Sequence, residues 1–246
     1  MVTQQHGDGP AFGGSISFSK VVDLSWPVHP GIPQWPGDPA VGFETVASFK
    51  DDGYFLRRFS MGEHSGTHLS APSGFQQGAP GHEAFSSQDL VRPAVVIDIA
   101  IQAKADPDYA LTMNDILDWE SGHGPVPQGC LVLLRTGWQA KWGRPMDYLG
   151  GTTAAQLHFP GFGLDATQIL LEGRKIAGLG ADTAGAEPGA DTDFSVSRYA
   201  LENRLIVLEN LTNLELLPLT GALLVVGLLR LDGGSGGPAS VTALVP

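Results

Sequence analysis

The sequence predicts an α/β fold built as a single domain, and three observations support this. Five short runs are almost continuously apolar rather than alternating, which is typical of strands covered on both faces: 94–99, 130–134, 175–179, 205–208 and 222–228. Segments between these runs carry helix start signals. No linker rich in proline, glycine or serine divides the 246 residues, so we expect one domain rather than two.

Two helices are predicted between the strands. Thr112 offers an N-cap hydroxyl and Asp115 follows three residues later, the spacing of a capping box, ahead of an apolar pair. A second helix is expected over 164–172, where apolar residues form one stripe after the loop 160–163. A last strand is expected over 240–245. Strands that alternate with single helices indicate an α/β protein.

The first third of the chain has few helix signals and interleaves aromatic residues with proline. Residues 1–20 are polar and rich in glycine, so we expect a flexible N-terminal segment, followed by the domain at 21–246. The aromatic residues that come next, among them Trp35, either line a pocket or pack a stiff strap. The sequence leaves both possibilities open.

Composition narrows the possible partners. The chain has 14 basic against 26 acidic residues, a net charge of -12, which argues against nucleic acid as a partner. The basic residues form no cluster that would hold an anionic membrane surface. We expect no signal peptide, because the first 20 residues lack an apolar run. The apolar run at 221–229 is too short to span a bilayer.

Cys130 is the one cysteine of the chain. Because it directly precedes an apolar strand, we interpret it as a small buried group rather than a nucleophile. One cysteine excludes a disulfide framework within the chain and suggests a reducing compartment, so we expect a cytoplasmic protein.

The segment 64–72 carries the strongest chemical signal. His64 and His68 flank Gly66, and neutral imidazole is the commonest protein ligand for catalytic metals. In an extended segment His64, His68 and Ser70 would share one face. A turn at Gly66 would draw the two rings together. The pair therefore predicts either a present or ancestral metal site or a set of hydrogen-bonding side chains.

Other side chains stand at the ends of predicted strands or in loops. Glu209 ends the strand 205–208, a position where ligands sit in α/β sheets and where burial would suit a carboxylate to proton transfer. Asp182 is expected to cap the turn that follows it. His158 precedes a Phe-Pro-Gly segment from which it could reach a pocket. Ser235 matches G-x-S-x-G, but no helix follows it, so we reject a nucleophile elbow and expect the glycines to allow a close backbone approach to a ligand or to another chain.

Together these motifs resemble the cyclase family of metal-dependent amide and lactone hydrolases, which contains bacterial kynurenine formamidase and isatin hydrolase. Residues 64–72 are similar to the family signature H-x-G-T-H-x-D-x-P-x-H, and the remaining motifs fall in the family's order: 23–25, 35–39, 135–138, 159–161, 180–183, 209–214 and 233–238. The resemblance implies a swivelling β/β/α architecture with a central β-barrel-like sheet. It also implies assembly as a homodimer or homotetramer.

The departures from the family pattern fall on functional positions. The resemblance implies that the two His residues and the Asp of the signature bind metal, and that its last His acts in acid–base catalysis. Here the Asp position is Ser70 and the last His position is Gly74. Relatives with a second metal take a His twelve residues before the Glu that matches Glu209, and that position is Ser197. We therefore expect no resident metal, His64 and His68 being a vestigial pair, with Zn or Mn as the alternative.

These departures favour an enzyme that keeps the family pocket and works without a complete metal site. We expect cyclisation, isomerisation or dehydration of a small secondary-metabolite intermediate by acid–base catalysis. The alternatives are a metal-dependent hydrolase of an amide, lactone or formamide, and a non-catalytic ligand-binding protein. The expected catalytic residues are His64, His68 and Glu209, and the expected substrate-binding residues are Ser70, Gly74, Ser197, Trp35 and His158.

Overall fold

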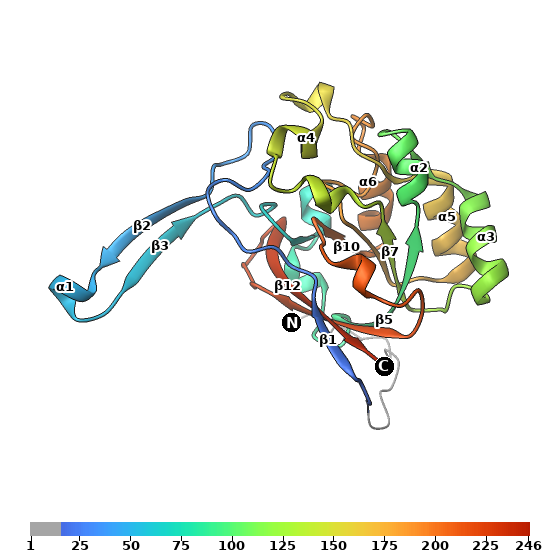
Figure 1. The fold of residues 1–246 in the computed structure, drawn as a ribbon, viewed down its shortest axis with the longest axis horizontal. Helices are drawn as coiled ribbons and strands as arrows, with labels where there is room; N and C mark the ends of the chain where they lie inside the picture. Colours follow the sequence, from blue (N-terminus) through green and yellow to red (C-terminus); the bar gives the residue numbers. More distant parts are fainter. Residues whose placement is uncertain (1–15) are drawn as a thin grey trace.

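A closed barrel of seven strands forms the centre of the protein in the computed structural model, which describes residues 16–246 (Figure 1). Hydrogen bonds connect the strands in the order β12-β11-β5-β7-β9-β10-β4, and β4 pairs again with β12 to close the ring, while β1 joins β12 from outside. The strands are β1 (Lys20–Asp23), β4 (His68–Ser70), β5 (Val91–Asp98), β7 (Leu131–Arg135), β9 (Gly178–Ala181), β10 (Ile206–Glu209), β11 (Ala222–Leu228) and β12 (Gly236–Val245). The predicted α/β class and barrel-like sheet are confirmed.

Strands β5, β7, β9 and β10 run parallel to one another and correspond to four of the predicted apolar runs. Their apolar character reflects burial on two sides. Leu131 and Leu133 of β7 pack in the barrel interior. Val132 and Leu134 point the other way, into the layer between the sheet and the helices. This alternation of direction along a strand explains why both faces must be apolar.

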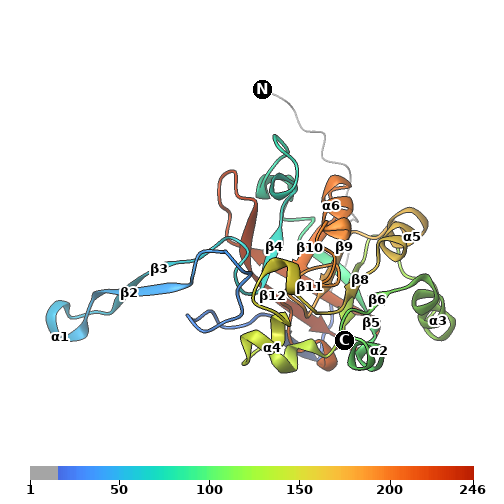
Figure 2. The same ribbon diagram turned by 90° about the horizontal axis from the view of Figure 1, so that it is seen from above.

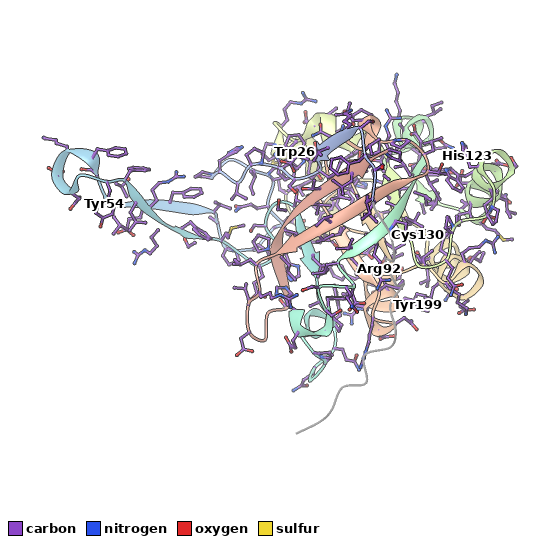
Figure 3. All side chains as sticks on the ribbon, turned by 90° about the horizontal axis from the view of Figure 1, so that it is seen from below. Trp26, Tyr54, Arg92, His123, Cys130 and Tyr199 are labelled. Carbon is purple, nitrogen blue, oxygen red and sulfur yellow. The ribbon has the colours of Figure 1, made fainter. Side chains whose placement is uncertain are left out.

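Helices cover one side of the barrel (Figure 1): α2 (Ala100–Ala105), α3 (Met113–His123), α5 (Leu164–Arg174) and α6 (Ser195–Glu202). The predicted capping box of Thr112 and Asp115 starts α3, and the second predicted helix is α5. Cys130 is fully buried in this layer (Figure 3), and burial raises the pKa of its thiol to about 12. The remaining elements are α4 (Pro145–Leu149), the paired strands β6 (Ala110–Leu111) and β8 (Gly161–Phe162), and 3-10 turns at Pro72–Gly74, His82–Ala84, Trp138–Lys141, Ala154–Gln156 and Leu214–Leu216.

A two-stranded arm extends away from the barrel (Figures 1 and 2). It consists of β2 (Gly42–Ala47), the short helix α1 (Phe49–Asp52) and β3 (Leu56–Ser60), which pairs antiparallel with β2. Every residue of β3 is exposed, and Tyr54 lies far from the body of the protein (Figure 3). The sequence analysis did not predict this hairpin.

The aromatic residues of the N-terminal third serve both of the purposes that the sequence left open. Trp26 stacks on Trp142 with ring centroids 4.9 Å apart, as part of a packed strap. Trp35 lines a cavity. Residues 1–15 of the expected flexible segment lie outside the described residues. Within the described part of the chain, none of the helices has the length and apolar character needed to cross a membrane.

Candidate active site

A cavity of about 240 Å³ lies beside strands β4 and β10. The structure brings seven of the sequence-predicted site residues to its wall: Trp35, His64, His68, Ser70, Gly74, Ser197 and Glu209. On β4, His68 and Ser70 are two residues apart and share the cavity side, whereas Leu69 between them packs into the barrel interior. Gly66 has a φ of 67°, a conformation that suits glycine, and the rings of His64 and His68 lie 5.1 Å apart at nearly a right angle.

His68 and Glu209 form the most deeply buried charged contact of the cavity. They face each other across the antiparallel pair β4–β10, and His68 Nε2 lies 2.9 Å from the Glu209 carboxylate, although the two atoms are not aligned as a regular hydrogen bond. His68 Nδ1 lies 2.9 Å from the carbonyl oxygen of Gly66. Burial works to lower the pKa of His68, but Glu209 and the Gly66 carbonyl raise it above its usual value. Glu209 and the Gly66 carbonyl therefore make His68 more basic than a free imidazole.

His64 is held between two serine hydroxyls. Its Nε2 lies 3.1 Å from Ser235 Oγ, and its Nδ1 lies 3.5 Å from Ser70 Oγ. Ser235 in turn donates from Oγ (2.7 Å) and from its backbone N–H (2.8 Å) to the carboxylate of Glu63. Burial and the neighbouring His68 lower the pKa of His64 to about 4, so that this ring is neutral at pH 7.

The glycine run that resembled a nucleophile elbow has a packing role at His64. A Cβ on Gly236 would lie 2.5 Å from a carbon of the His64 ring, which is closer than atoms can pack. Glycine therefore allows β12 to pass against the imidazole. The close backbone approach is therefore present, but what Gly236 approaches is a side chain of the same protein rather than the expected ligand or second chain.

Glu187 is a site residue that the sequence analysis missed. It lies in the loop between β9 and α6, and its carboxylate accepts hydrogen bonds from the backbone N–H (2.7 Å) and the Oγ (3.0 Å) of Ser197, at the start of α6. Burial, with the negative charge of Glu209 nearby, raises its pKa to about 7 despite these bonds. No sequence pattern marks it, because its partner is ten residues away in a different element.

Aromatic rings form the opposite wall of the cavity. The ring of Phe194 lies 5.7 Å from that of Trp35 and 5.5 Å from that of Phe75. The lining includes the carboxylates of Asp38, Glu187 and Glu209 but no lysine or arginine. Burial raises the pKa of Asp38. The cavity thus combines an aromatic wall with hydrogen-bonding groups and carboxylates, which suits an uncharged aromatic molecule.

Two sequence-based expectations are wrong. His158 does not line the cavity: its ring is half exposed and pairs with Asp108 at 2.8 Å. The adjacent Phe159 takes the inward direction and is buried, which turns His158 outward. Asp182 does not cap the turn that follows it. Instead its carboxylate accepts hydrogen bonds from Thr136 and from the backbone N–H of Gly137, and so holds the turn after β7.

The residues at the family's metal positions do not fit a metal ion. Ser70 supplies a neutral hydroxyl, a poor ligand compared with a carboxylate. Both ring nitrogens of His64 face serine hydroxyls, and His68 turns Nε2 directly to Glu209. Among residues 16–246, no group of three or more His, Cys, Asp or Glu side chains is arranged to hold a metal.

Comparisons with known proteins agree with this fold. The Cyclase family model matches residues 22–188. The chain is 32% identical to isatin hydrolase of Roseibium aggregatum over 92% of both chains, and 31% identical to kynurenine formamidase of Bacillus mycoides over 78% of this chain and 82% of that protein. Among solved structures, isatin hydrolase A from Ralstonia solanacearum superimposes with a TM-score of 0.87 at 30% identity, covering 92% of each chain. An isatin hydrolase bound to the product analogue thioisatinate gives 0.85 at 31% identity, again over 92% of each chain.

Proposed function

Because this chain belongs to the Cyclase family, we propose that it is a hydrolase of a small, uncharged aromatic carbonyl compound: a cyclic amide, a lactone or an aryl formamide. One observation carries the proposal. Two imidazoles with different polar partners line one cavity that has an aromatic wall. His64 lies between two serine hydroxyls, and His68 contacts the carboxylate of Glu209. The named relatives, isatin hydrolase and kynurenine formamidase, support hydrolysis over the cyclisation that the sequence alone favoured.

The two imidazoles suit different parts of an acyl transfer. Attack on a carbonyl carbon moves negative charge onto the carbonyl oxygen, and a preorganised positive group beside that oxygen lowers the barrier. His68 is the side chain for this role, because Glu209 favours its protonated form. His64 is the neutral ring that accepts and returns protons.

The charge of the lining supports an uncharged substrate. Asp38, Glu187 and Glu209 face the cavity and no lysine or arginine lines it, while His68 is already paired with Glu209, so an anion would find no free cation there. Phe75, Phe194 and Trp35 offer ring faces for an aromatic substrate. A carboxylic acid formed by hydrolysis would be disfavoured in the same surroundings, which helps its release.

We propose that the enzyme works without a resident metal, since its side chains do not form a ligand set. The direct test is turnover of isatin, an aryl lactone and an aryl formamide by protein treated with EDTA and dialysed. In oxygen-18 water, hydrolysis adds one labelled oxygen to the product, detected by mass spectrometry. Glu209→Gln should lower kcat at least tenfold, and the exposed Glu202→Gln is the matched control. Activity that vanishes with EDTA and returns with Zn²⁺ or Mn²⁺ contradicts the metal-free proposal.

A second candidate function is the cyclisation, isomerisation or dehydration expected from the sequence. The observation that favours it is Glu187, whose pKa of about 7 lets it both give and take a proton near neutral pH. Product mass separates the two candidates. Hydrolysis adds one water, isomerisation leaves the mass unchanged, and dehydration removes one water. Tight binding of aromatic compounds with no turnover would favour the non-catalytic alternative.

We propose further that the protein is cytoplasmic and that two copies associate through the arm. Exposed aromatic side chains gather on it, including Phe49, Tyr54 and Phe55. Residues 42–60 carry three basic and three acidic residues, so the arm brings no net charge toward a second, acidic copy. Light scattering should give a dimer or tetramer for the wild type. Phe49→Ser with Phe55→Ser should give a monomer, and a monomeric wild type would refute the association.

A further inference from the structure

We propose that Ser70 is the nucleophile of this hydrolysis and that His64 is its base. The inference rests on the proposed hydrolase function and adds a covalent intermediate to it. The structure provides the three parts that an activated serine needs: a hydroxyl facing the cavity, an imidazole within reach of it, and groups that orient the imidazole.

The hydrogen-bond chain fixes which nitrogen of His64 carries the proton. Ser235 Oγ donates its one hydrogen to the carboxylate of Glu63, at 2.7 Å. Toward His64 Nε2, 3.1 Å away, Ser235 can then only accept, so Nε2 must carry the proton. In the neutral ring Nδ1 therefore has the free lone pair, and Nδ1 is the atom that faces Ser70 Oγ. The tautomer required of a general base follows from Glu63 and Ser235.

The separation of Ser70 Oγ from His64 Nδ1, 3.5 Å, is at the long end for a hydrogen bond. Nucleophile–base pairs without substrate are often looser than in the reacting complex. Burial and the neighbouring His68 disfavour the imidazolium of His64, and the carboxylates of Glu209 and Glu63 offset part of this cost. Ser70 thus has an acceptor in Nδ1, and two carboxylates lie near that acceptor.

The reaction balances without a further reagent. The Ser70 Oγ–H proton moves to His64 Nδ1 as Oγ forms a bond to the substrate's carbonyl carbon. The carbon–nitrogen or carbon–oxygen bond of the substrate then breaks, and the leaving atom takes the proton from His64. Water next gives a proton to His64 and its oxygen bonds to the acyl carbon. Ser70 leaves with that proton, and the product is a carboxylic acid.

Ser65 provides an internal control. It is buried, as Ser70 is, and precedes the same strand, but its Oγ has no hydrogen-bond partner among the described residues and it does not line the cavity. A hydroxyl that only fills space should resemble Ser65. Ser70 differs from Ser65 because its hydroxyl lies near His64 Nδ1 and lines the cavity.

The test uses 4-nitrophenyl acetate as an acylating probe on EDTA-treated protein. We expect a burst of nitrophenol close to one per chain and an acetyl group assigned to Ser70 by fragmentation mass spectrometry. Ser70→Ala should lose the adduct and at least a hundredfold of kcat, and Ser65→Ala should keep both. Ser235→Ala, which removes the group that fixes the tautomer, should slow acylation at least tenfold.

The outcomes separate this inference from the proposed function. If isatin, the lactone and the formamide are all left intact, hydrolysis itself is refuted. If they are hydrolysed but Ser70→Ala keeps wild-type kcat, or if the acetyl group lies elsewhere, the nucleophile is wrong and the hydrolase stands. Ser70→Cys guards against a misfolded alanine variant: it should form a thioester adduct at the same position, and a folded Ser70→Cys protein without one contradicts the proposal.

Discussion

Replacing Glu187 with glutamine should destabilise the folded protein slightly at low pH and stabilise it at high pH. The carboxyl has a pKa near 4.5 in the unfolded chain and about 7 in the folded one, because burial penalises its charged form. A raised folded pKa means that the folded protein holds more protons. Its contribution to stability is therefore fully present below pH 4.5 and is lost as the pH rises through 7.

The difference between the two pKa values sets the magnitude. At ~1.4 kcal/mol per unit, ionising Glu187 in the folded protein costs about 3 kcal/mol above pH 8. Glutamine removes this cost and still accepts the backbone N–H of Ser197, but it replaces the neutral acid's hydrogen bonding with Ser197 Oγ less well, a loss of about 1 kcal/mol at every pH. The net gain for Glu187→Gln above pH 8 is about 2 kcal/mol. For a chain of this size that corresponds to a rise in Tm of roughly 4–8 °C.

The assay is thermal unfolding of both proteins from pH 5 to pH 9, followed by circular dichroism. Asp182, whose pKa burial raises to about 6, titrates in both proteins and cancels in the difference. We expect the variant to be slightly less stable than the wild type at pH 5 and more stable at pH 8 and above. A difference in Tm that stays constant across the range would show that Glu187 is not a buried group that loses its proton near pH 7, and would refute the reasoning.

Three further predictions concern other residues. Cys130 should resist maleimide in the native protein and react fully in guanidinium, because burial keeps its thiol protonated with a pKa of about 12; rapid native labelling would contradict this. His158→Ala should keep kcat within about twofold, since it pairs with Asp108 outside the cavity, whereas His68→Ala should lose at least tenfold; equal losses in steady-state assays would contradict the placement. Ser70→Asp, which restores the family's carboxylate, should bind Mn²⁺ at least about tenfold more tightly than the wild type in calorimetry, a gain of ~1.4 kcal/mol; unchanged affinity would contradict it.

The parts of the fold that the sequence predicts are those where local pattern and burial coincide. Strands β5 and β7 are apolar runs, because the barrel interior and the helix layer each require an apolar face, whereas β11 turns Leu224 and Val226 inward and leaves Val225 exposed. Closure of the barrel depends instead on β4, three residues long and containing His68 and Ser70. Neither length nor composition marks it as a strand. Its place is set by pairing with β10 and β12, which are distant in sequence.

The arm escaped prediction for the opposite reason. Every residue of β3 is exposed, and one of the six residues of β2 is buried. No alternation between a buried and an exposed face therefore develops, and that alternation is the signal by which a strand is recognised. Apolar residues such as Phe59 are next to charged ones such as Arg58 in the sequence, and the apolar positions do not recur every second residue as in a half-buried strand.

The site was predictable to the extent that its residues lie in one segment. His64, His68 and Ser70 share a face, and the turn at Gly66 follows from its being glycine. Glu187 was not predictable, because a loop glutamate gives no sign that a distant helix start will bury it. The orientation of His64 depends on Ser235, about 170 residues away in sequence, and no local pattern connects the two.

The replacements at the family's functional positions agree with one another electrostatically. With three carboxylates already lining the cavity, a fourth at position 70 would need a cation to balance it, because uncompensated charge in a buried site is costly. A hydroxyl adds no charge and leaves Glu209 paired with His68, whose pKa is raised by this contact. At the position of the second-metal histidine, the hydroxyl of Ser197 likewise donates a hydrogen bond to Glu187 and adds no charge. Serine at both positions therefore agrees with the proposed metal-free cavity, and at position 70 the same hydroxyl lies 3.5 Å from His64 Nδ1.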